Sequence, residues 1–369
     1  MDNFKIPLYK PTLNSNEKKY VIECLDEGWI SSKGKFVEKF EDKFSEYLNI
    51  KYSITCANGT TALHLALLSL GIGPGDEVLV PSLTYVASVN AITYCGAKPI
   101  FIDSNKDDFQ LNPLLIRNSL TKNTKAVLAV HLYSSACELD LIKQICEENN
   151  LFLIEDCAES LGTKYKNEFT GTFGHVSTFS FYGNKTISTG EGGMVCTNDA
   201  NIAKKVMLYK GQGLDIESEK YYSHIVVGYN YRMTNICAAI GLAQLEQLDN
   251  ILVKKREIAA AYFNELNNIQ DIRFQNIDKK NISSSFWLVS ITCKNLTTRN
   301  DLMQYLSKKN IETRPFFIPM NELNIYKDYL NSTPISSYLS SVGLNLPSYP
   351  ELSIEEITHI SSIIRSFFE

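Results

Sequence analysis

The sequence predicts an α/β protein with a mostly parallel sheet flanked by helices. Through the first half of the chain, short continuous runs of valine, isoleucine and leucine alternate with helical segments, the pattern of parallel strands buried on both faces. The 369 residues exceed what one ordinary hydrophobic core contains, and the pattern changes after about residue 255. We therefore expect a large α/β domain with an N-terminal helical segment at 1–250 and a smaller α+β domain at 251–369.

The first elements can be placed in order. Residues 16–28 and 37–48 have the periodicity of amphipathic helices, and serine and glycine interrupt that periodicity in WISSKGK at 29–35. The β-branched segment YSIT precedes a turn at 57–59, after which a long apolar helix begins at Thr60. Strand, turn and helix form the first unit of the expected sheet.

The same unit recurs along the chain. The segments EVLVPSL, PIFID, AVLAVHLY and LFLIEDCA read as strands, and YVASVNAITYC and ELDLIKQICEENN read as helices between them. STFSFYG and GGMVCTN read as two more strands. A single long helix with a continuous apolar stripe is expected from residue 235, and a strand pair around SSFWLVSITC belongs to the smaller domain.

Composition argues against several classes of function. Hydrophobic residues make up 44% of the chain and charged residues 21%, as in globular proteins, and the net charge of −5 argues against a nucleic-acid partner. The nine cysteines form no CxxC pair and the five histidines are scattered, so we expect free thiols and no metal site, with His131 the one histidine near a strand end. Neither a secretion signal nor a membrane-spanning run is visible, which predicts a cytoplasmic protein without a membrane partner.

Lys185 stands in FSFYGNKTISTGEGGM, a stretch of small and hydroxylated residues closed by a glycine-rich turn. Alone it would be interpreted as a surface lysine. Asp156 ends the strand LFLIED, and ligands of open parallel sheets bind just outside such strand ends, although an aspartate there can simply cap a helix. Together the two residues fit pyridoxal 5'-phosphate, because a lysine can form an imine with it and a carboxylate can keep its ring nitrogen protonated.

A phosphate group and an aromatic ring need further partners. Gly59 and Thr60 open the long helix after the first strand, and a helix N-terminus binds phosphate, although the same residues also suit a simple helix cap. Ser180 offers a second hydroxyl. Tyr85 follows another strand, where its face could stack on the ring, and a core tyrosine is the alternative.

Five motifs in the order of the chain resemble the sugar aminotransferase family of the DegT/DnrJ/EryC1/StrS type: NGTTALHLAL, GPGDEVLVPSLTYVAS, EDCAESLGTKY, FSFYGNKTISTGEGGM and GYNYRMTNICAAIGLAQLEQL. The resemblance covers nearly the whole chain and is greatest to the branch of GDP-perosamine synthases. It implies a fold-type I pyridoxal phosphate enzyme. Such an enzyme moves an amino group from glutamate, which leaves as 2-oxoglutarate, to a nucleotide-linked keto-deoxysugar of the GDP-4-keto-6-deoxyhexose type, for O-antigen or capsule polysaccharide.

The resemblance also assigns roles to single residues. Lys185 would hold the cofactor and then move a proton, Asp156 would pair with the ring nitrogen, and Glu159, where many relatives carry glutamine, would approach the ring oxygen. Contacts to the phosphate and the ring fall to Gly59, Thr60, Ser180 and Tyr85. The loop with Asn230 and Arg232 would reach the cofactor phosphate of a neighbouring subunit, which implies a homodimer with shared active sites; a helix starting at Thr234 is the plainer explanation of that stretch.

The acceptor is the least constrained part. Candidate substrate contacts are Trp29, Ser31, Lys33, Tyr182, Arg232 and Arg314. Where the perosamine branch usually carries a Gly-His-Pro-like segment and a later histidine, this chain has Ser134, Ser135, Ala136 and Asn321. These departures indicate either a changed pocket or variation in surface loops. A second acceptor therefore stays open, a small phosphorylated ketone such as dihydroxyacetone phosphate, and either acceptor bears phosphate.

The residues alone leave two other classes of function open. One is a regulatory protein that keeps the fold without catalysis. The other is a lysine-dependent aldolase, in which Lys185 would form an imine with the substrate itself and Asp156 would have no ring nitrogen to face. Some relatives that replace the lysine by histidine catalyse dehydration, so a lysine at 185 favours transamination.

Overall fold

The computed structural model describes residues 4–215, 217–276, 281–329 and 332–369. Its centre is a seven-stranded sheet in the order β1-β9-β8-β5-β4-β2-β3. The strands are β1 (Tyr52–Cys56), β2 (Glu77–Pro81), β3 (Lys98–Ile102), β4 (Thr124–Val130), β5 (Phe152–Asp156), β8 (Val176–Ser180) and β9 (Gly193–Thr197). The four pairings among β2, β3, β4, β5 and β8 are parallel, and β9 runs antiparallel to both of its neighbours. The mostly parallel α/β sheet that the sequence predicts is confirmed.

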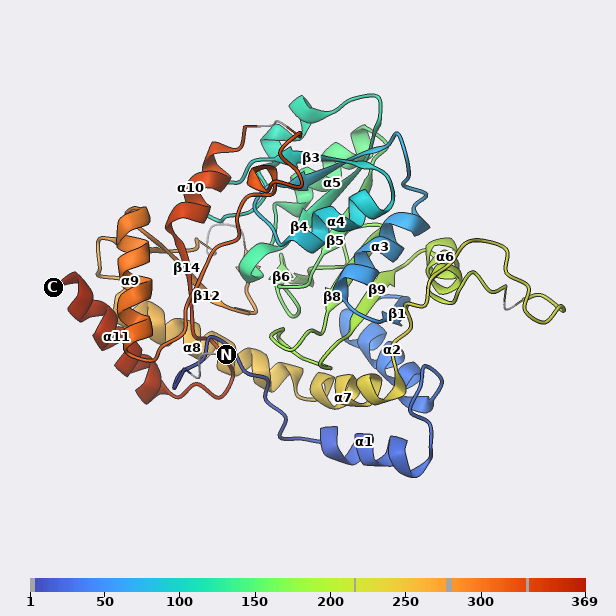
Figure 1. Cartoon of the computed structure of the whole chain (residues 1–369), viewed down its shortest axis with the longest axis horizontal. Helices are drawn as coiled ribbons and strands as arrows, with labels where there is room; N and C mark the ends of the chain where they lie inside the picture. The colour runs from blue at the N-terminus through green and yellow to red at the C-terminus, as the bar shows by residue number, and fades with distance from the viewer. Residues whose placement is uncertain (1–3, 216, 277–280, 330–331) are drawn as a thin grey trace.

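Helices cover both faces of this sheet because alternate residues of each strand point to opposite faces. Val78 and Val80 of β2 pack in one cluster with α3 (Gly59–Ser69), α4 (Val86–Tyr94) and α6 (Ala200–Lys210), while Leu79 packs in another with α5 (Leu139–Glu148). The phenylalanines of α2 (Lys35–Leu48) lie against Phe179 and Phe181. Figure 1 shows α1 (Glu17–Asp26) outside this layer, next to α7 (Asn235–Leu245).

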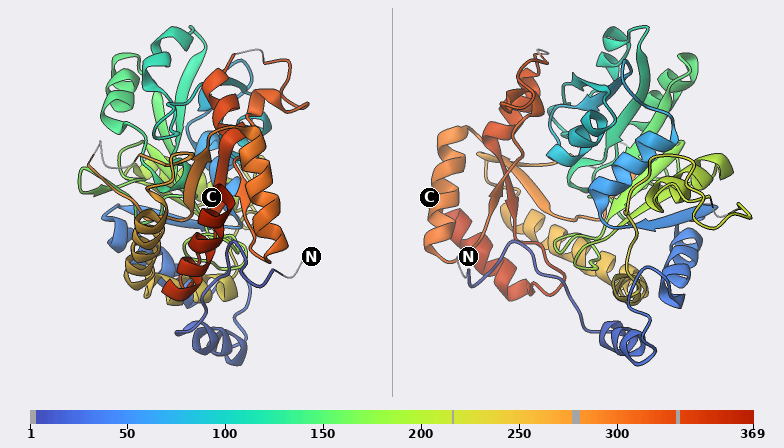
Figure 2. Two further views of the ribbon diagram at one scale, coloured as in Figure 1. Left: turned by 90° about the vertical axis from the view of Figure 1, so that its left-hand side faces the viewer. Right: turned by 45° about the vertical axis from the view of Figure 1, so that its right-hand side comes forward.

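A smaller antiparallel sheet, β10-β12-β14-β13, stands beside the first one (Figures 1 and 2). Its strands are β10 (Ile272–Phe274), β12 (Val289–Cys293), β13 (Arg314–Pro315) and β14 (Gly343–Leu346), and its helices are α9 (Leu296–Lys308), α10 (Pro334–Val342) and α11 (Ile354–Phe368). A third sheet joins β6 (Lys164–Tyr165) and β7 (Glu168–Phe169) to β11 (Ile282–Ser283). The N-terminal arm also packs here, since Ile6 bridges Ile311 and the Leu8 N–H donates to Glu312 at 2.9 Å.

The single long helix expected from residue 235 is wrong, because the chain bends by 60° between α7 and α8 (Leu248–Leu266). The first half of α8 packs in the core of the large sheet through Leu248 and Leu252, and the second half packs in the core of the small sheet through Tyr262 and Leu266. The bend turns one apolar stripe from the first core to the second. The domain boundary at residue 250 falls inside α8 and stays a prediction.

Within the described ranges, no single helix is long and apolar enough to cross a membrane. The helices α7 and α8 pass that test of length and composition only when they are taken together across their bend, and many of their residues are buried inside the protein.

Candidate active site

A cavity of about 480 Å³ opens at the carboxyl ends of the central strands, between the large sheet and the small one. The loops after β1, β2, β5 and β8 form one side, and residues around β12, β13 and β14 form the other. Among the residues proposed from the sequence, those that line this cavity are Gly59, Thr60, Tyr85, Asp156, Glu159, Ser180, Tyr182, Lys185 and Arg314.

The other proposed residues lie outside this cavity and are exposed: Trp29, Ser31, Lys33, Asn230 and Arg232. They belong to two segments that meet at the start of α7. The Asn235 N–H donates to the Ser31 carbonyl at 2.6 Å, and the Asn235 side chain donates to the Trp29 carbonyl at 2.7 Å. The Arg232 guanidinium donates to Asn230 at 3.2 Å. In a single chain these residues are therefore exposed at the surface and are not part of the lining of the cavity.

Lys185 reaches the cavity from the loop between β8 and β9. The loop is closed by a bridge between Tyr182 and Gly190, and Gly190 has a φ of +81°, which glycine adopts without strain. The Lys185 Nζ lies 3.6 Å from Oε1 of Glu159 and 4.1 Å from the centre of a Trp287 ring, and its side chain is only 14% exposed. Lys185 is therefore a shielded amine with an acid beside it, and not a surface lysine.

Asp156 ends β5 and is buried, with 4% of its surface exposed. Its carboxylate accepts a hydrogen bond from the Ser88 hydroxyl at 2.8 Å and one from the Ala158 N–H at 3.1 Å. Burial raises the pKa of Asp156, because the charged form loses solvation, and the two donors and Lys185 oppose that rise. A buried carboxylate with spare acceptor sites is stabilised by a cation, and a protonated ring nitrogen is such a cation.

Glu159 is the second buried acid of the cavity. Its Oε2 accepts the Tyr133 N–H at 3.0 Å, while its Oε1 faces Lys185. Burial raises the pKa of Glu159, and the positive charge of Lys185 opposes the rise. The carboxylate therefore depends on a nearby positive group to stay ionised.

The start of α3 has the form of a phosphate cradle. Asn58 caps the helix by accepting the Thr61 N–H at 2.9 Å, and Gly59 and Thr60, in the first turn, line the cavity. A Cβ added to Gly59 would lie 2.7 Å from the Cβ of Ser180, closer than real Cβ contacts come. Glycine is thus what allows the helix N-terminus and the Ser180 hydroxyl to approach each other. An anion fits at such a place.

Tyr85 is not a core tyrosine, because 57% of its surface is exposed and it lines the cavity. Its ring centre lies 5.6 Å from that of Phe317, which follows β13 of the small sheet. An amine, a buried carboxylate, a helix N-terminus with a hydroxyl and an exposed aromatic face thus share one cavity. These are the groups that pyridoxal phosphate requires, so the cavity fits that cofactor in chemistry.

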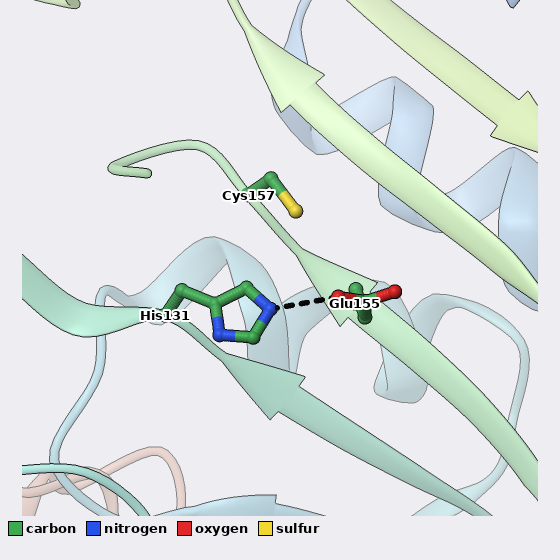
Figure 3. Close-up of side chains that lie close together, drawn as sticks. All are labelled: His131, Glu155 and Cys157. Atoms are coloured by element: carbon green, nitrogen blue, oxygen red, sulfur yellow. Dashed lines mark hydrogen bonds and ion pairs between the residues drawn. The ribbon is translucent and has the colours of Figure 1, made fainter. Parts of the chain in front are cut away.

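His131 lies at the end of β4, close to the site, and both of its ring nitrogens are engaged. Figure 3 shows the bond to Glu155. Its Nδ1 accepts the Cys137 N–H at 3.1 Å, so the proton is on Nε2, which donates to Glu155 at 3.0 Å. Glu155 also accepts three backbone N–H groups, from Gly171, Phe173 and Gly174. Although Cys157 lies within reach of both side chains, this arrangement leaves no nitrogen lone pair of His131 for a metal ion.

The residues after β4 that differ from the perosamine branch do not lie in a variable surface loop. Ser134, Ser135 and Ala136 are fully buried, and none of them lines the cavity. The reason is that residues 284–287 cover them, since Ser284 and Trp287 both bond to Ser134. Asn321 is partly buried and accepts hydrogen bonds from the hydroxyls of Ser82 and Thr333. Any effect of these residues on the pocket is therefore indirect.

Several lining residues were missed by the sequence reasoning. Trp287 precedes β12 and appeared only as part of a strand, while Tyr9, whose hydroxyl donates to the Lys185 carbonyl at 2.6 Å, comes from the N-terminal arm. Neither has a local signal of function. Asn184 could have been found, because it directly precedes Lys185 in the motif and lines the cavity.

The fold and the cavity define the class of protein, and three comparisons agree with it. The model of the DegT/DnrJ/EryC1/StrS aminotransferase family matches residues 11–365. The GDP-perosamine synthase of Escherichia coli O157:H7 is 50% identical over 363 residues, which are 98% of each chain, and that of Vibrio cholerae is 45% identical over 98% of this chain and 99% of its own. The crystal structure of the aminotransferase TlmJ from Streptoalloteichus hindustanus has a TM-score of 0.93 at 26% identity, covering 98% of both chains.

The chain belongs to the DegT/DnrJ/EryC1/StrS aminotransferase family. It is a pyridoxal phosphate-dependent aminotransferase that takes its amino group from glutamate, releases 2-oxoglutarate and acts on a sugar ketone. The enzyme class and cofactor predicted from the sequence are confirmed, in preference to a regulator without catalysis or an aldolase without cofactor.

Proposed function

We propose that the enzyme aminates a GDP-linked 4-keto-6-deoxyhexose for surface polysaccharide, as a homodimer with shared active sites. The observation that supports this acceptor is the similarity along nearly the whole chain, at 50% and 45% identity, to enzymes named GDP-perosamine synthase. The positions of the side chains around the cavity support the site residues and the dimer.

Pyridoxal phosphate, when bound, supplies a ring that accepts the electrons released when a proton leaves the carbon bearing the amino group. Lys185 would hold the cofactor through its Nζ, and its free amine would carry the proton to or from the substrate carbon. Asp156 would keep the ring nitrogen protonated. Because Lys185 is only 14% exposed, the proton it carries is shielded from exchange with bulk water.

The phosphate of the cofactor is assigned to the start of α3. Gly59 and Thr60 offer N–H groups of the first helical turn, which have no partner within the helix, and Ser180 offers its hydroxyl from the end of β8. Tyr85 would cover the ring and Glu159 would lie near the ring oxygen, since both side chains line the cavity.

Charge supports a shared site. Within the described ranges, Lys185 and Arg314 are the lysine and arginine side chains of the cavity lining, and Lys185 is engaged by the cofactor. Arg314, 56% exposed, suits one anionic group, but a diphosphate and the carboxylates of glutamate require more positive charge. Lys33 and Arg232 are exposed and do not line the cavity of their own chain. We assign them, with Trp29, Ser31 and Asn230, to the cavity of a second copy, and Tyr182 to the substrate in its own.

A coupled assay with a panel of acceptors tests this proposal. Purified enzyme would receive glutamate with GDP-linked, UDP-linked and dTDP-linked 4-keto-6-deoxyhexoses, or with dihydroxyacetone phosphate, and the 2-oxoglutarate released would be measured. We expect kcat/KM for the GDP-linked sugar to exceed the others by about tenfold or more. Faster turnover of dihydroxyacetone phosphate would contradict the proposed acceptor and would show that the enzyme acts on a small keto phosphate.

A further inference from the structure

We propose that Trp287 positions the amine of Lys185, and that Ser134 and Lys255 hold Trp287 in place for this purpose. The inference rests on the role of Lys185 proposed above. All three residues lie outside the motifs that define the family resemblance, and two of them lie outside the cavity lining.

The indole of Trp287 contacts the amine of Lys185. The Lys185 Nζ lies 4.1 Å from the centre of a Trp287 ring on one side and 3.6 Å from Oε1 of Glu159 on the other. The face of an indole attracts a cation and also excludes water. Because Trp287 is only 4% exposed, the ring has little freedom to leave, and the amine is confined between an acid and an aromatic wall.

A hydrogen bond fixes the orientation of the ring. The indole Nε1–H donates to the carbonyl of Asn184, the residue that precedes Lys185. The ring is thereby tied to the backbone of the loop that carries the lysine, so that movement of the loop and movement of the wall are linked.

The hydroxyl of Ser134 connects the two residues between which the amine lies, Trp287 and Glu159. It accepts the N–H of Trp287 at 2.6 Å and donates to the carbonyl of Glu159 at 2.7 Å. Ser134 has a φ of +68°, directly after Tyr133 at +51°, a left-handed conformation that glycine would adopt with less strain. The hydroxyl is what serine provides and glycine does not, and it fixes the spacing of the groups on either side of the amine.

Lys255 on α8 is a fully buried lysine. Its Nζ donates to the Trp287 carbonyl at 2.7 Å and to the Ser348 carbonyl, and it lies 5.0 Å from the centre of the Tyr9 ring. The backbone of Trp287 is thus held at its N–H by Ser134 and at its carbonyl by Lys255. Burial of an amine costs free energy, and the two hydrogen bonds compensate for part of that cost. One of these bonds fixes the backbone of Trp287, whose ring contacts the Lys185 amine.

The test separates positioning of the amine from general damage to the cavity. The full-length enzyme is freed of its cofactor, and the rate at which it captures pyridoxal phosphate is followed by absorbance, since capture needs the Lys185 amine. The affinity for pyridoxamine phosphate is measured in parallel, because that ligand binds the same cradle without a covalent bond to lysine. Wild-type capture, with borohydride labelling of Lys185, first checks the proposed function itself.

The variants are Trp287→Leu, Trp287→Phe, Ser134→Gly and Lys255→Met, each compared with wild type. Ser135→Ala is the matched control for Ser134, because the Ser135 hydroxyl is buried next to it and has no hydrogen-bond partner among the described residues. Lys254→Met is the control for Lys255, because Lys254 is the adjacent, exposed lysine of α8.

We expect Trp287→Leu, Ser134→Gly and Lys255→Met to slow capture by roughly tenfold or more, since a small misplacement of a reacting group costs that much. Pyridoxamine phosphate affinity in the Ser134 and Lys255 variants should stay within about threefold of wild type, and both controls should behave as wild type. Trp287→Phe should recover only part of the rate lost in Trp287→Leu, because it restores an aromatic wall but not the N–H that bonds to the Asn184 carbonyl. Capture at the wild-type rate in Ser134→Gly, or a parallel loss of pyridoxamine phosphate affinity, would overturn the inference. If Lys185 is not labelled in wild type, the proposed function fails first.

Discussion

The Nζ of Lys185 lies 3.6 Å from Oε1 of Glu159, and the two side chains are 14% and 5% exposed. This pair joins the loop after β8 to the loop after β5 in the lining of the cavity. Because Glu159 is buried, its pKa is raised above the ordinary value of 4.5, and the charge of Lys185 limits the rise most, together with the hydrogen bond from the Tyr133 N–H.

The pair makes the stability of the cofactor-free protein depend on pH in a predictable direction. An acid whose pKa is raised by folding stabilises the fold at pH values below its unfolded pKa, and that contribution is lost as pH rises through the folded pKa. Lys185→Ala leaves the Glu159 carboxylate without its cation, so the loss should be larger. We expect Lys185→Ala to be less stable at pH 8 than Lys185→Ala/Glu159→Gln by roughly 1–3 kcal/mol.

Urea denaturation of the two variants from about pH 4 to pH 8 measures this difference. The gap in the free energy of unfolding should widen as pH rises through the folded pKa of Glu159 and should change little at the acid end. Parallel curves over the whole range would mean that folding does not raise the pKa of Glu159 when the cation is missing.

Asp156→Asn tests the assignment of the ring nitrogen. The amide keeps an acceptor for Ser88 or Ala158 but removes the charge that holds a proton on the ring, so proton abstraction should slow by roughly a hundredfold or more. The decrease should appear in kcat, while cofactor still binds to Lys185. A kcat near that of wild type would count against the role of Asp156.

Gly59→Ala tests the phosphate cradle by filling the space between α3 and β8. The added Cβ would lie 2.7 Å from the Cβ of Ser180, so the helix N-terminus must move away, and affinity for pyridoxal phosphate should fall by roughly tenfold or more. Gly73→Ala is the matched control, because its Cβ would have no neighbour closer than 4.0 Å. Equal affinity in the two variants would place the phosphate elsewhere.

Mixed dimers test whether the active site is shared. Lys185→Ala in one subunit and Asn230→Ala/Arg232→Ala in the other leave one of the two sites with an intact set of residues, since the lysine of one chain would meet the loop of the other. Heterodimers purified through two different tags should show about half of the wild-type activity, although each parent homodimer is nearly inactive. Activity no higher than that of the parents, or a monomer in solution, would rule out the shared site.

Much of the fold could be predicted from sequence because the signals are local. Continuous apolar strands such as LFLIED, alternating with helices, specify a parallel sheet, and the strand ends then place Asp156 and the loop of Lys185 at one edge. The bend between α7 and α8 could not be predicted in this way. The apolar periodicity continues through it, and it is the second core, formed by distant residues, that turns the helix.

The site was predictable in the same measure. Residues on strand ends and helix starts were found, whereas Tyr9 and Trp287 reach Lys185 only because the N-terminal arm and the small sheet fold back over the cavity. Ser134 is buried because residues 284–287 cover it, and no feature of the segment HLYSSACELD predicts this burial.

The most direct measurement is reduction of the holoenzyme with borohydride, followed by peptide mass spectrometry. We expect one pyridoxyl group per chain, attached to the peptide that contains Lys185 and absent from the Lys185→Ala variant. A pyridoxyl group on any other residue, or an unmodified Lys185 in enzyme that carries its cofactor, would contradict the role of Lys185.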